Sequence, residues 1–142
     1  MLRRIFRASL LVAVIGSAGA PAIHAQDSNI QAAQASVEAW LSLVDGQNYA
    51  ASWTAAAALF RNAVTRENWE SAVQTARVPL GPLKSRTLKA ATVTRTLPGA
   101  PDGEYVVFQF TASFERKAAA LETVTALLEP DGTWHVSGYF VR

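Results

Sequence analysis

Two carboxylates stand where a titrating side chain could do chemistry, Glu122 and Asp45. Glu122 lies in an extended apolar run, and the predicted pairing of that run with the next one aims its side chain at the apolar side. A buried carboxylate is costly unless it is paired. Glu122 therefore either serves in a pocket as an acid, a base or a ligand anchor, or pairs with an arginine such as Arg77 or Arg86. We favour the arginine pair.

Asp45 follows the last apolar residue of a predicted helix. A carboxylate at a helix C-terminus opposes the helix dipole, so we expect Asp45 to cap the next segment or to hold an arginine. The alternative use of both carboxylates is catalytic. With Glu122 or Asp45 as general base in a pocket, the chain would be a small isomerase or hydrolase.

His135 is the other candidate for acid-base chemistry, and it stands next to Trp134 in a predicted strand. A catalytic histidine needs a second group that orients it. No serine, cysteine or acidic residue stands at a spacing that predicts such a partner, so we interpret His135 as a half-exposed strand residue. The chain has no cysteine, and a metal site would need carboxylates from dispersed positions. We expect no metal and no cofactor.

The tryptophans are the third group of interest, because all four fall on predicted inward faces. They are Trp40, Trp53, Trp69 and Trp134. Burial in the core accounts for them, although aromatic side chains that line a cone could also hold an apolar or sugar-like ligand. The pocket residues we name as candidates for ligand binding are Trp53, Phe110, Glu122 and Phe140.

Three helices are predicted before any strand. Apolar residues repeat at helical spacing in residues 30–44, and Gly46 is placed to end that helix in the left-handed C-cap position. Residues 48–62 predict a second helix, with a break allowed near Thr54 because Thr and Ser are weak helix formers. Thr65 predicts the N-cap of a third helix, which Pro79 and the glycine and proline after it end.

The pattern changes to strands from residue 83 onward. Residues 83–97 are rich in threonine and alternate imperfectly, which predicts a long, bent or bulged strand. Residues 104–115 alternate cleanly, which predicts a strand with one core face. Its predicted core residues are Val106, Phe108, Phe110, Ala112 and Phe114.

The last part of the chain predicts a hairpin around residues 129–133. Pro130 presets φ for the turn, and Gly132 takes the left-handed conformation that closes a three-residue loop with Glu129 opposite Thr133. Counting outward gives these opposed pairs: Leu128 with Trp134, Ala126 with Val136, Val124 with Gly138, and Glu122 with Phe140. The predicted fold class is α+β, with N-terminal helices packed on a curled four-stranded antiparallel sheet.

The chain also resembles a known family through several motifs. They include Trp40-Leu41-x-Leu43-Val44-Asp45, Ser52-Trp53, Phe60-Arg61, Leu97-Pro98-Gly99-x-Pro101-Asp102-Gly103-x-Tyr105 and Glu129-x-Asp131-Gly132-x-Trp134-x-Val136-x-Gly138-Tyr139. The resemblance is to the exported bacterial family catalogued as domain of unknown function 4019. It implies a cone-shaped fold similar to nuclear transport factor 2, and it implies no activity and no catalytic residues.

The N-terminus is typical of a secretory signal peptide. A basic start with Arg3, Arg4 and Arg7 precedes an apolar stretch too short to span a bilayer, and Ala25 offers a small residue for cleavage. We therefore expect residues 1–25 to be removed, and residues 26–142 to form a single domain in the periplasm or outside the cell. An uncleaved anchor is the alternative.

Removal of the signal peptide changes the charge balance. The full chain carries a net charge of +2, whereas residues 26–142 keep ten basic and eleven acidic residues and a net charge of −1. Because the basic residues are scattered, we expect neither a nucleic-acid partner nor a membrane contact after cleavage. The function that we expect is an exported module that binds a small ligand or a protein partner. A homodimer through the threonine-rich sheet face is a further expectation.

Overall fold

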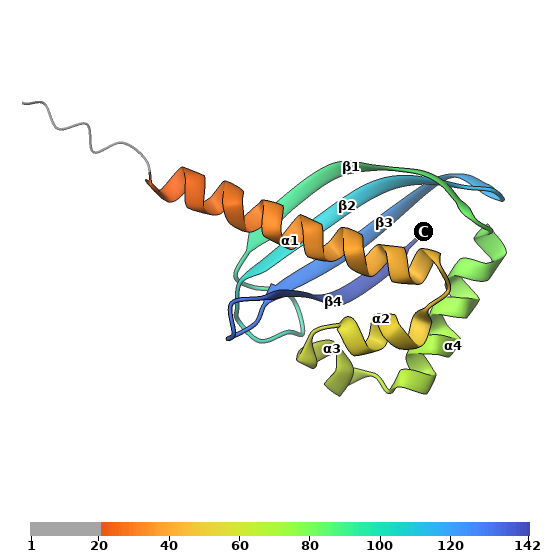
Figure 1. The fold of residues 1–142 in the computed structure, drawn as a ribbon, viewed down its shortest axis with the longest axis horizontal. Helices are drawn as coiled ribbons and strands as arrows, with labels where there is room; N and C mark the ends of the chain where they lie inside the picture. Colours follow the sequence, from red (N-terminus) through yellow and green to blue (C-terminus); the bar gives the residue numbers. More distant parts are fainter. Residues whose placement is uncertain (1–20) are drawn as a thin grey trace, which may run out of the picture.

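The computed structural model describes residues 21–142, and it describes side chains from Ala25 onward. Most of the predicted signal peptide, residues 1–20, lies outside the described residues. The elements in chain order are α1 (Pro21–Asp45), α2 (Tyr49–Ala55), α3 (Ala58–Ala63), α4 (Arg66–Arg77), the 3-10 turn η1 (Val78–Leu80), β1 (Leu83–Thr94), β2 (Tyr105–Phe114), β3 (Lys117–Leu128) and β4 (Trp134–Val141). Helices followed by strands confirm the predicted α+β class (Figure 1).

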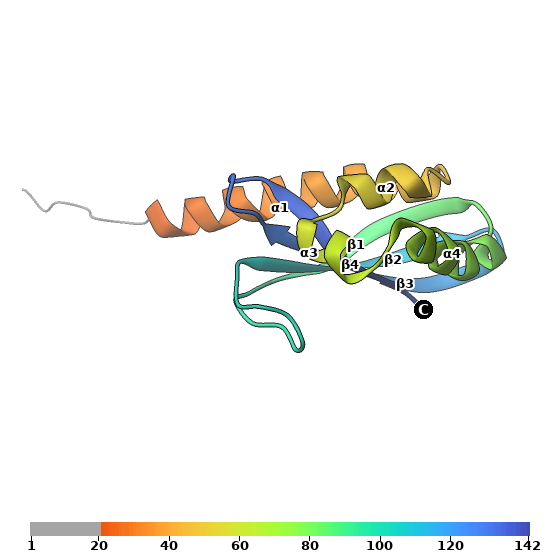
Figure 2. The ribbon, with the colours of Figure 1, turned by 90° about the horizontal axis from the view of Figure 1, so that it is seen from below.

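The four strands form one antiparallel sheet in the order β1-β2-β3-β4. Figure 1 shows α1 running across this sheet, and Figure 2 shows that α1 and α2 lie on one side of it. The loop between β1 and β2 drops to the other side (Figure 2). The sheet therefore has an inner face that the helices cover and an outer face that none of the helices in residues 21–142 covers.

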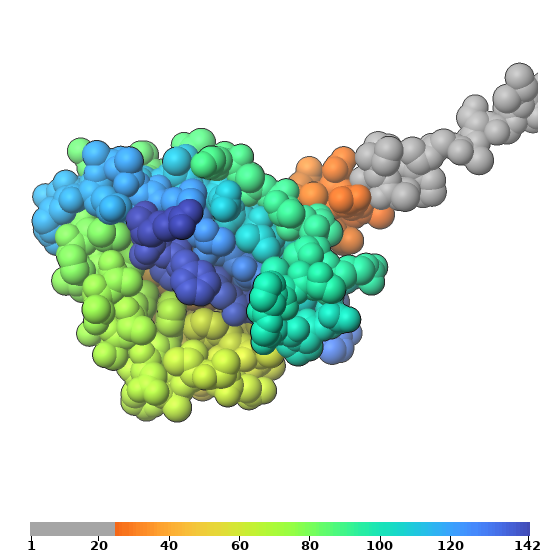
Figure 3. Space-filling view, turned by 180° about the vertical axis from the view of Figure 1, so that it is seen from behind, coloured from red at the N-terminus to blue at the C-terminus, as the bar shows by residue number. Residues whose placement is uncertain are grey.

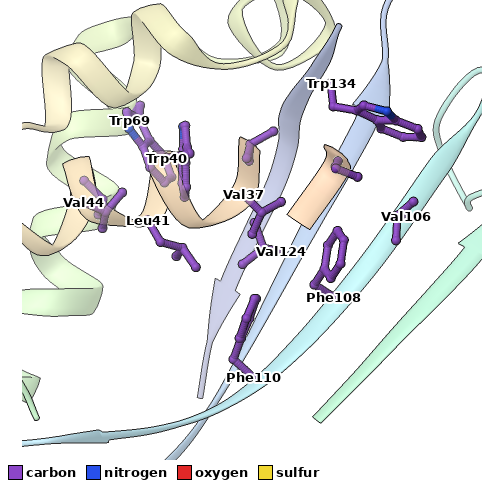
Figure 4. Close-up of a cluster of buried hydrophobic side chains, with 14 of the residues drawn as sticks. Val37, Trp40, Leu41, Val44, Trp69, Val106, Phe108, Phe110, Val124 and Trp134 are labelled. Carbon is purple, nitrogen blue, oxygen red and sulfur yellow. The ribbon is translucent and has the colours of Figure 1, made fainter. Parts of the chain in front are cut away.

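The core lies between α1 and the inner face of the sheet (Figure 4). The residues that the helical spacing predicted to face inward are all at most 3% exposed: Val37, Trp40, Leu41 and Val44. They pack in one cluster with Phe108, Phe110 and Val124 of the sheet. Each such side chain contributes about 1.5–3 kcal/mol by leaving water, so this face of α1 fixes its position on the sheet.

The end of α1 differs from the prediction by one residue. Gln47, and not Gly46, takes the left-handed conformation, with φ of 60°. The amide of Asn48 donates to the Leu43 carbonyl at 2.8 Å, and the amide of Gln47 donates to the Val44 carbonyl at 3.0 Å. This is the paired hydrogen-bond pattern of a Schellman C-cap. The motif satisfies the last carbonyls of α1 and turns the chain into α2.

The predicted helix over residues 48–62 is two helices, because the chain breaks at Ala56 and Ala57. Both residues are fully buried, and the Ala57 amide donates to the Val136 carbonyl of β4 at 2.8 Å. The break that the sequence allowed near Thr54 therefore occurs two residues later. Its cause is a tertiary hydrogen bond and not the low helix propensity of Thr54.

Ser52 joins three helices in the core, and it was not singled out in the sequence. Its side chain is fully buried, and its Oγ accepts a hydrogen bond from Trp69 Nε1 at 2.9 Å. Its carbonyl accepts a second hydrogen bond from Trp40 Nε1 at 2.8 Å. A buried indole N–H needs an acceptor, so Ser52 allows two tryptophans to pack side by side.

The strands carry the irregularities that the sequence predicted for residues 83–97. The β1–β2 register shifts between Leu83 and Ser85 and again between Leu88 and Ala90. In β2, the five residues with predicted core positions are all buried, at most 5% exposed. The strands are therefore where the sequence pattern placed them.

The register of the terminal hairpin is correct near its loop and wrong beyond it. Leu128 faces Trp134 and Ala126 faces Val136, as predicted, but the register then shifts, so Thr125 faces Gly138 and Glu122 faces Val141. This bulge at Ser137 adds one residue to β4 and reverses the side to which later residues point. Tyr139 faces inward as a result, and Phe140 is 76% exposed on the outer face.

The loop of this hairpin confirms the predicted role of Gly132, whose φ is 86°. The Glu129 amide donates to the Thr133 carbonyl at 2.8 Å, and the Gly132 amide donates to the Glu129 carbonyl at 2.9 Å. A Cβ added at Gly132 would meet no atom within 4 Å. Any penalty for a larger residue at this position therefore comes from the backbone.

Gly132→Val is expected to lower the free energy of unfolding by about 1–3 kcal/mol, because a β-branched residue is strained at positive φ. Urea denaturation measures this loss. The matched control is Gly138→Ala in the same hairpin, where φ is not positive and the new Cβ meets Thr125 at an ordinary 3.7 Å. Equal stability of Gly132→Val and the unsubstituted chain would contradict the left-handed assignment.

Candidate functional site

The two carboxylates that the sequence singled out, Glu122 and Asp45, meet in a cluster of charged side chains at the end of α1. Asp45 is the last residue of α1, Arg77 is the last residue of α4, and Arg86 lies on β1. Arg86 binds Asp45 with both terminal nitrogens, Nη1 to Oδ2 at 2.7 Å and Nη2 to Oδ1 at 2.9 Å. Arg77 Nη2 donates to Asp45 Oδ1 at 2.7 Å. The expectation that Asp45 binds an arginine is confirmed, and it binds two of them.

Glu122 of β3 forms the other half of this cluster and is fully buried. Arg86 Nε donates to its Oε1 at 2.7 Å. The Tyr139 hydroxyl donates to its Oε2 at 2.5 Å, and Arg77 Nη1 lies 3.8 Å from the same oxygen. The prediction that Glu122 pairs with Arg77 or Arg86 is confirmed, and both arginines take part.

The five residues Asp45, Arg77, Arg86, Glu122 and Tyr139 are called the charged cluster below. Its two carboxylates balance its two guanidinium groups. Burial on its own raises the pKa of Asp45, but the hydrogen bonds and charges of Arg86 and Arg77 outweigh burial, so the pKa of Asp45 lies below its ordinary value. Burial and the Glu122 charge raise the pKa of Tyr139 well above its ordinary value, so its hydroxyl stays protonated and donates.

A lowered pKa of Asp45 makes part of the stability depend on pH. A carboxylate of this kind contributes stability above its unfolded pKa of ~3.9, and the contribution is lost as the pH falls through the lower folded pKa. We therefore expect the free energy of unfolding to fall in acid, below about pH 4. Asp45→Asn is expected to be less stable at neutral pH and to show a shallower acid loss. Chemical denaturation across pH measures both, and parallel pH profiles would contradict the prediction.

The geometry of the charged cluster suits structure better than proton transfer. A general base needs a lone pair that faces a substrate. Both oxygens of Glu122 already accept short hydrogen bonds and are closed off from solvent, and both oxygens of Asp45 bind guanidinium nitrogens. The guanidinium of Arg77 also lies 4.7 Å over the Phe114 ring, which fixes it further.

Comparison with known protein families gives one match, over residues 36–139, to the family described as protein of unknown function, DUF4019. The chain belongs to this family. The matched range contains all members of the charged cluster. A comparison with curated proteins found no match.

The four pocket candidates do not come together in this DUF4019 chain. Phe110 is 2% exposed within the core, and Glu122 belongs to the charged cluster. Trp53 packs against the core, and its Nε1 donates to the Val64 carbonyl at 2.9 Å. The predicted inward position of Phe140 is wrong, because the bulge in β4 turns it to the outer face.

His135 has partners that the sequence spacing did not predict. Its Nε2 lies 3.0 Å from Thr133 Oγ1, and its Nδ1 lies 3.2 Å from Glu129 Oε1 without forming a hydrogen bond. This order of acid, imidazole and hydroxyl is the order of a catalytic triad. However, Thr133 Oγ1 donates to Asp131 Oδ1 at 2.6 Å, so its proton is directed away from the histidine. The arrangement stabilises the hairpin loop.

Asp131 supports this structural interpretation of the loop. Hydrogen bonds from the Thr133 hydroxyl and from the Thr133 amide lower the pKa of Asp131, which keeps it ionised as an acceptor. Glu129 also links the loop to α3, since its Oε2 lies 3.5 Å from the Ala58 amide. The expectation that His135 is a half-exposed strand residue is confirmed, because it lies in β4 and its side chain is 33% exposed.

Several hollows open on the surface of the DUF4019 domain. One of about 360 Å³ lies between the first turns of α1 and the ends of β1 and β2, and it reaches Val106 and Trp134. Another of about 190 Å³ lies where α1, α4 and the β2–β3 turn meet, next to the charged cluster.

Among residues 21–142, no three His, Asp or Glu side chains are placed to hold a metal ion. None of the helices in that range is both long and apolar enough to cross a membrane.

Tyr139 is the member of the charged cluster that sequence reasoning missed. The regular alternation of β4 placed it on the outer face, and the bulge brings it inside. A signal existed, because a glycine inside a strand often marks a bulge, and Gly138 stands directly before Tyr139. The arginines were named as partners of Glu122, but their shared use of Asp45 depends on three elements that meet only in the fold.

Proposed function

We propose that this DUF4019 chain is an exported binding module without catalytic activity, and that it works as a symmetrical pair through the outer face of its sheet. The observation that carries the proposal is the composition of this face. Its side chains lie over four strands with no helix above them, as the space-filling view from behind shows (Figure 3). A face that only meets water normally carries charged residues.

The paired rows of the outer face contain no Asp, Glu or Lys, and their one Arg is Arg142, which exchanges backbone hydrogen bonds with Leu121 at the C-terminal corner. Across the strands these rows are Thr92, Val107, Thr125 and Gly138, then Ala90, Gln109, Thr123 and Phe140, then Thr87, Thr111 and Leu121, and finally Ser85 and Ser113. The other nearby charges stand at its rim, with Lys84 and Lys89 at the two register shifts of β1. Phe140 is 76% exposed within the face.

The loop between β1 and β2 closes one end of the face. The Tyr105 hydroxyl donates to the Pro101 carbonyl at 2.6 Å, so this loop covers Tyr105, which is 1% exposed. With strands ~4.8 Å apart and successive residues of one face ~6.6 Å apart along each strand, the residues of these rows cover roughly 400 Å². With the wall of the loop and the rim, this area approaches the roughly 600 Å² per partner at which specific interfaces begin.

A second copy of the chain is the occupant that fits the face. In a two-fold dimer the same patch meets itself, so a patch with charges of one sign repels its copy unless those charges are offset. A patch of threonine, valine, leucine and phenylalanine with its charges confined to the rim avoids most of this repulsion, and it gains from burying the exposed Phe140 ring. Threonine hydroxyls supply hydrogen bonds across the interface.

Sedimentation velocity over a range of protein concentrations tests the pair. We expect a concentration-dependent dimer for the unsubstituted protein and a monomer for Thr123→Lys, which places a charge in the centre of the face. Gln74→Lys is the matched control, since Gln74 is exposed on α4. A monomer at every concentration, or a Thr123→Lys protein that still dimerises, would contradict the proposal. Circular dichroism checks that each variant is folded.

Export is the second part of the proposal. It is supported by the basic start, the short apolar stretch and the small residue at position 25. Ala25 is exposed within the first turns of α1. Intact-mass measurement of the protein from a periplasmic extract tests export. A mass that begins at Gln26 is expected, and a full-length mass in the cytoplasmic fraction would contradict it.

Two finer expectations remain proposals. A curled sheet with helices on one face supports a fold similar to nuclear transport factor 2, which superposition of an experimental structure tests. The alternative function, an isomerase or hydrolase with Glu122 or Asp45 as general base, gains no support from the geometry, because both carboxylates are bound by arginines. A binding module is the function that these contacts support best.

A further inference from the structure

The second hollow described above lies beside the charged cluster, and two arginines line it, Arg77 and Arg116. It has a volume of about 190 Å³ and is lined by the end of α1, the start of α2, the end of α4 and the β2–β3 turn. Its polar side chains include Tyr49, Arg77 and Arg116, and its apolar walls include Val44, Val78 and Pro82.

The charge of this hollow is positive once the pairing of each group is considered. Arg77 and Asp45 also line it, but they are balanced within the charged cluster, where Asp45 already binds two arginines. Arg116 has no carboxylate partner among the ion pairs of the described residues. It donates from Nε to the Pro79 carbonyl at 3.0 Å and from Nη2 to the Val78 carbonyl at 2.7 Å.

These two hydrogen bonds hold the Arg116 guanidinium in place and leave its Nη1 without a partner in the described part of the chain. Tyr49 supplies a second donor. Its side chain is 93% buried, being 7% exposed, and within residues 21–142 its hydroxyl makes no hydrogen bond to protein although the residue lines the hollow. A fixed cation and a phenol O–H at one small hollow are the donors that an oxyanion needs.

We propose that this hollow binds a small carboxylate with a short apolar tail. The carboxylate oxygens accept hydrogen bonds from Arg116 and from the Tyr49 hydroxyl, and the tail lies against Val44, Val78 and Pro82. The volume of about 190 Å³ is enough for a molecule of a few heavy atoms. The apolar walls favour a carboxylate over inorganic phosphate, which has no apolar part to bury.

Calorimetric titration of the purified protein with sodium propionate tests the proposal, with sodium phosphate at matched ionic strength as the second arm. We expect propionate to bind at one site per chain and more tightly than phosphate.

Arg116→Met is expected to weaken propionate binding about tenfold or more, because it removes a charge-assisted hydrogen bond. Tyr49→Phe is expected to weaken it by a smaller factor. Arg66→Met, which changes an exposed arginine elsewhere on α4, is expected to leave it unchanged.

Three results would overturn the proposal: no propionate binding, phosphate binding that equals or exceeds it, or propionate binding that Arg116→Met does not weaken. Arg116→Lys separates loss of charge from loss of structure, since lysine keeps the charge and is expected to bind propionate better than methionine does. The hollow is not part of the outer face of the sheet. The result of this titration is therefore independent of whether the chain forms the proposed dimer.

Discussion

Replacing Arg86 by methionine is expected to lower the free energy of unfolding by about 3–5 kcal/mol. Arg86 contacts both carboxylates of the charged cluster, through Nε to Glu122 and through both terminal nitrogens to Asp45. Methionine keeps much of the side-chain volume and removes the charge. Glu122, which is fully buried, would then lose its closest cationic partner, with Arg77 Nη1 left 3.8 Å away.

Urea denaturation measures this loss, and two further variants locate its cause. Arg66→Met removes an arginine whose ion pair with Glu67 is exposed, and it is expected to change stability by less than about 0.5 kcal/mol. Arg86→Met combined with Glu122→Gln is expected to recover part of the loss, because the uncompensated buried charge is gone. A loss below about 1 kcal/mol for Arg86→Met would show that the cluster contributes little to stability.

Phe110→Ala is expected to lower the free energy of unfolding by about 3–5 kcal/mol, the usual range for removing a buried aromatic ring. Phe110 is 2% exposed and packs against Phe108 with ring centroids 6.3 Å apart. Phe140→Ala makes the same chemical change at a site that is 76% exposed. In the monomer it is expected to change stability by less than about 0.5 kcal/mol.

The comparison of these two phenylalanines tests the bulge in β4. If β4 were regular, Phe140 would face the core opposite Glu122, and both variants would be strongly destabilised. The measurement is urea denaturation at concentrations at which sedimentation shows a monomer, so that an effect of Phe140 on dimerisation does not enter. A loss of more than about 2 kcal/mol for Phe140→Ala would contradict the register described here.

Much of the fold could be predicted because hydrophobic periodicity reports directly on burial. The spacing of Val37, Trp40, Leu41 and Val44 predicted the buried face of α1, and the alternation in β2 predicted its core face. Thr65 was predicted as an N-cap, and its side chain accepts a hydrogen bond from the Asn68 amide at 3.2 Å. These features depend on residues close together in the sequence.

The two larger errors have a different origin, because each depends on pairing with another segment of the chain. The helix break at Ala56 and Ala57 follows from a hydrogen bond to β4. The bulge at Ser137 follows from how β4 pairs with β3, and it exchanges the positions of Tyr139 and Phe140. The alternation alone does not contain this information, and Gly138 inside the strand was a local indication of the bulge that the alternation outweighed.

The candidate site shows the same limit. A charged residue on an apolar strand face indicated that Glu122 needs a partner, and the sequence supplied the two correct arginines as candidates. It did not show that Asp45 would hold both, because α1, α4, β1, β3 and β4 meet only in the fold. The open surface was easier to predict, since a strand face rich in threonine is visible in the alternation itself.

The central claim is that two copies of the chain meet through the outer face of the sheet. Single cysteine substitutions test this claim most directly. The chain has no cysteine, so Gln109→Cys, Thr123→Cys and Thr125→Cys each introduce one thiol on this face, and Gln74→Cys introduces one on α4. A short bis-maleimide is added to each protein, and linked dimers are followed over time. We predict that at least one outer-face cysteine is linked far faster than Gln74→Cys. Linkage of all three no faster than that of Gln74→Cys would contradict the claim.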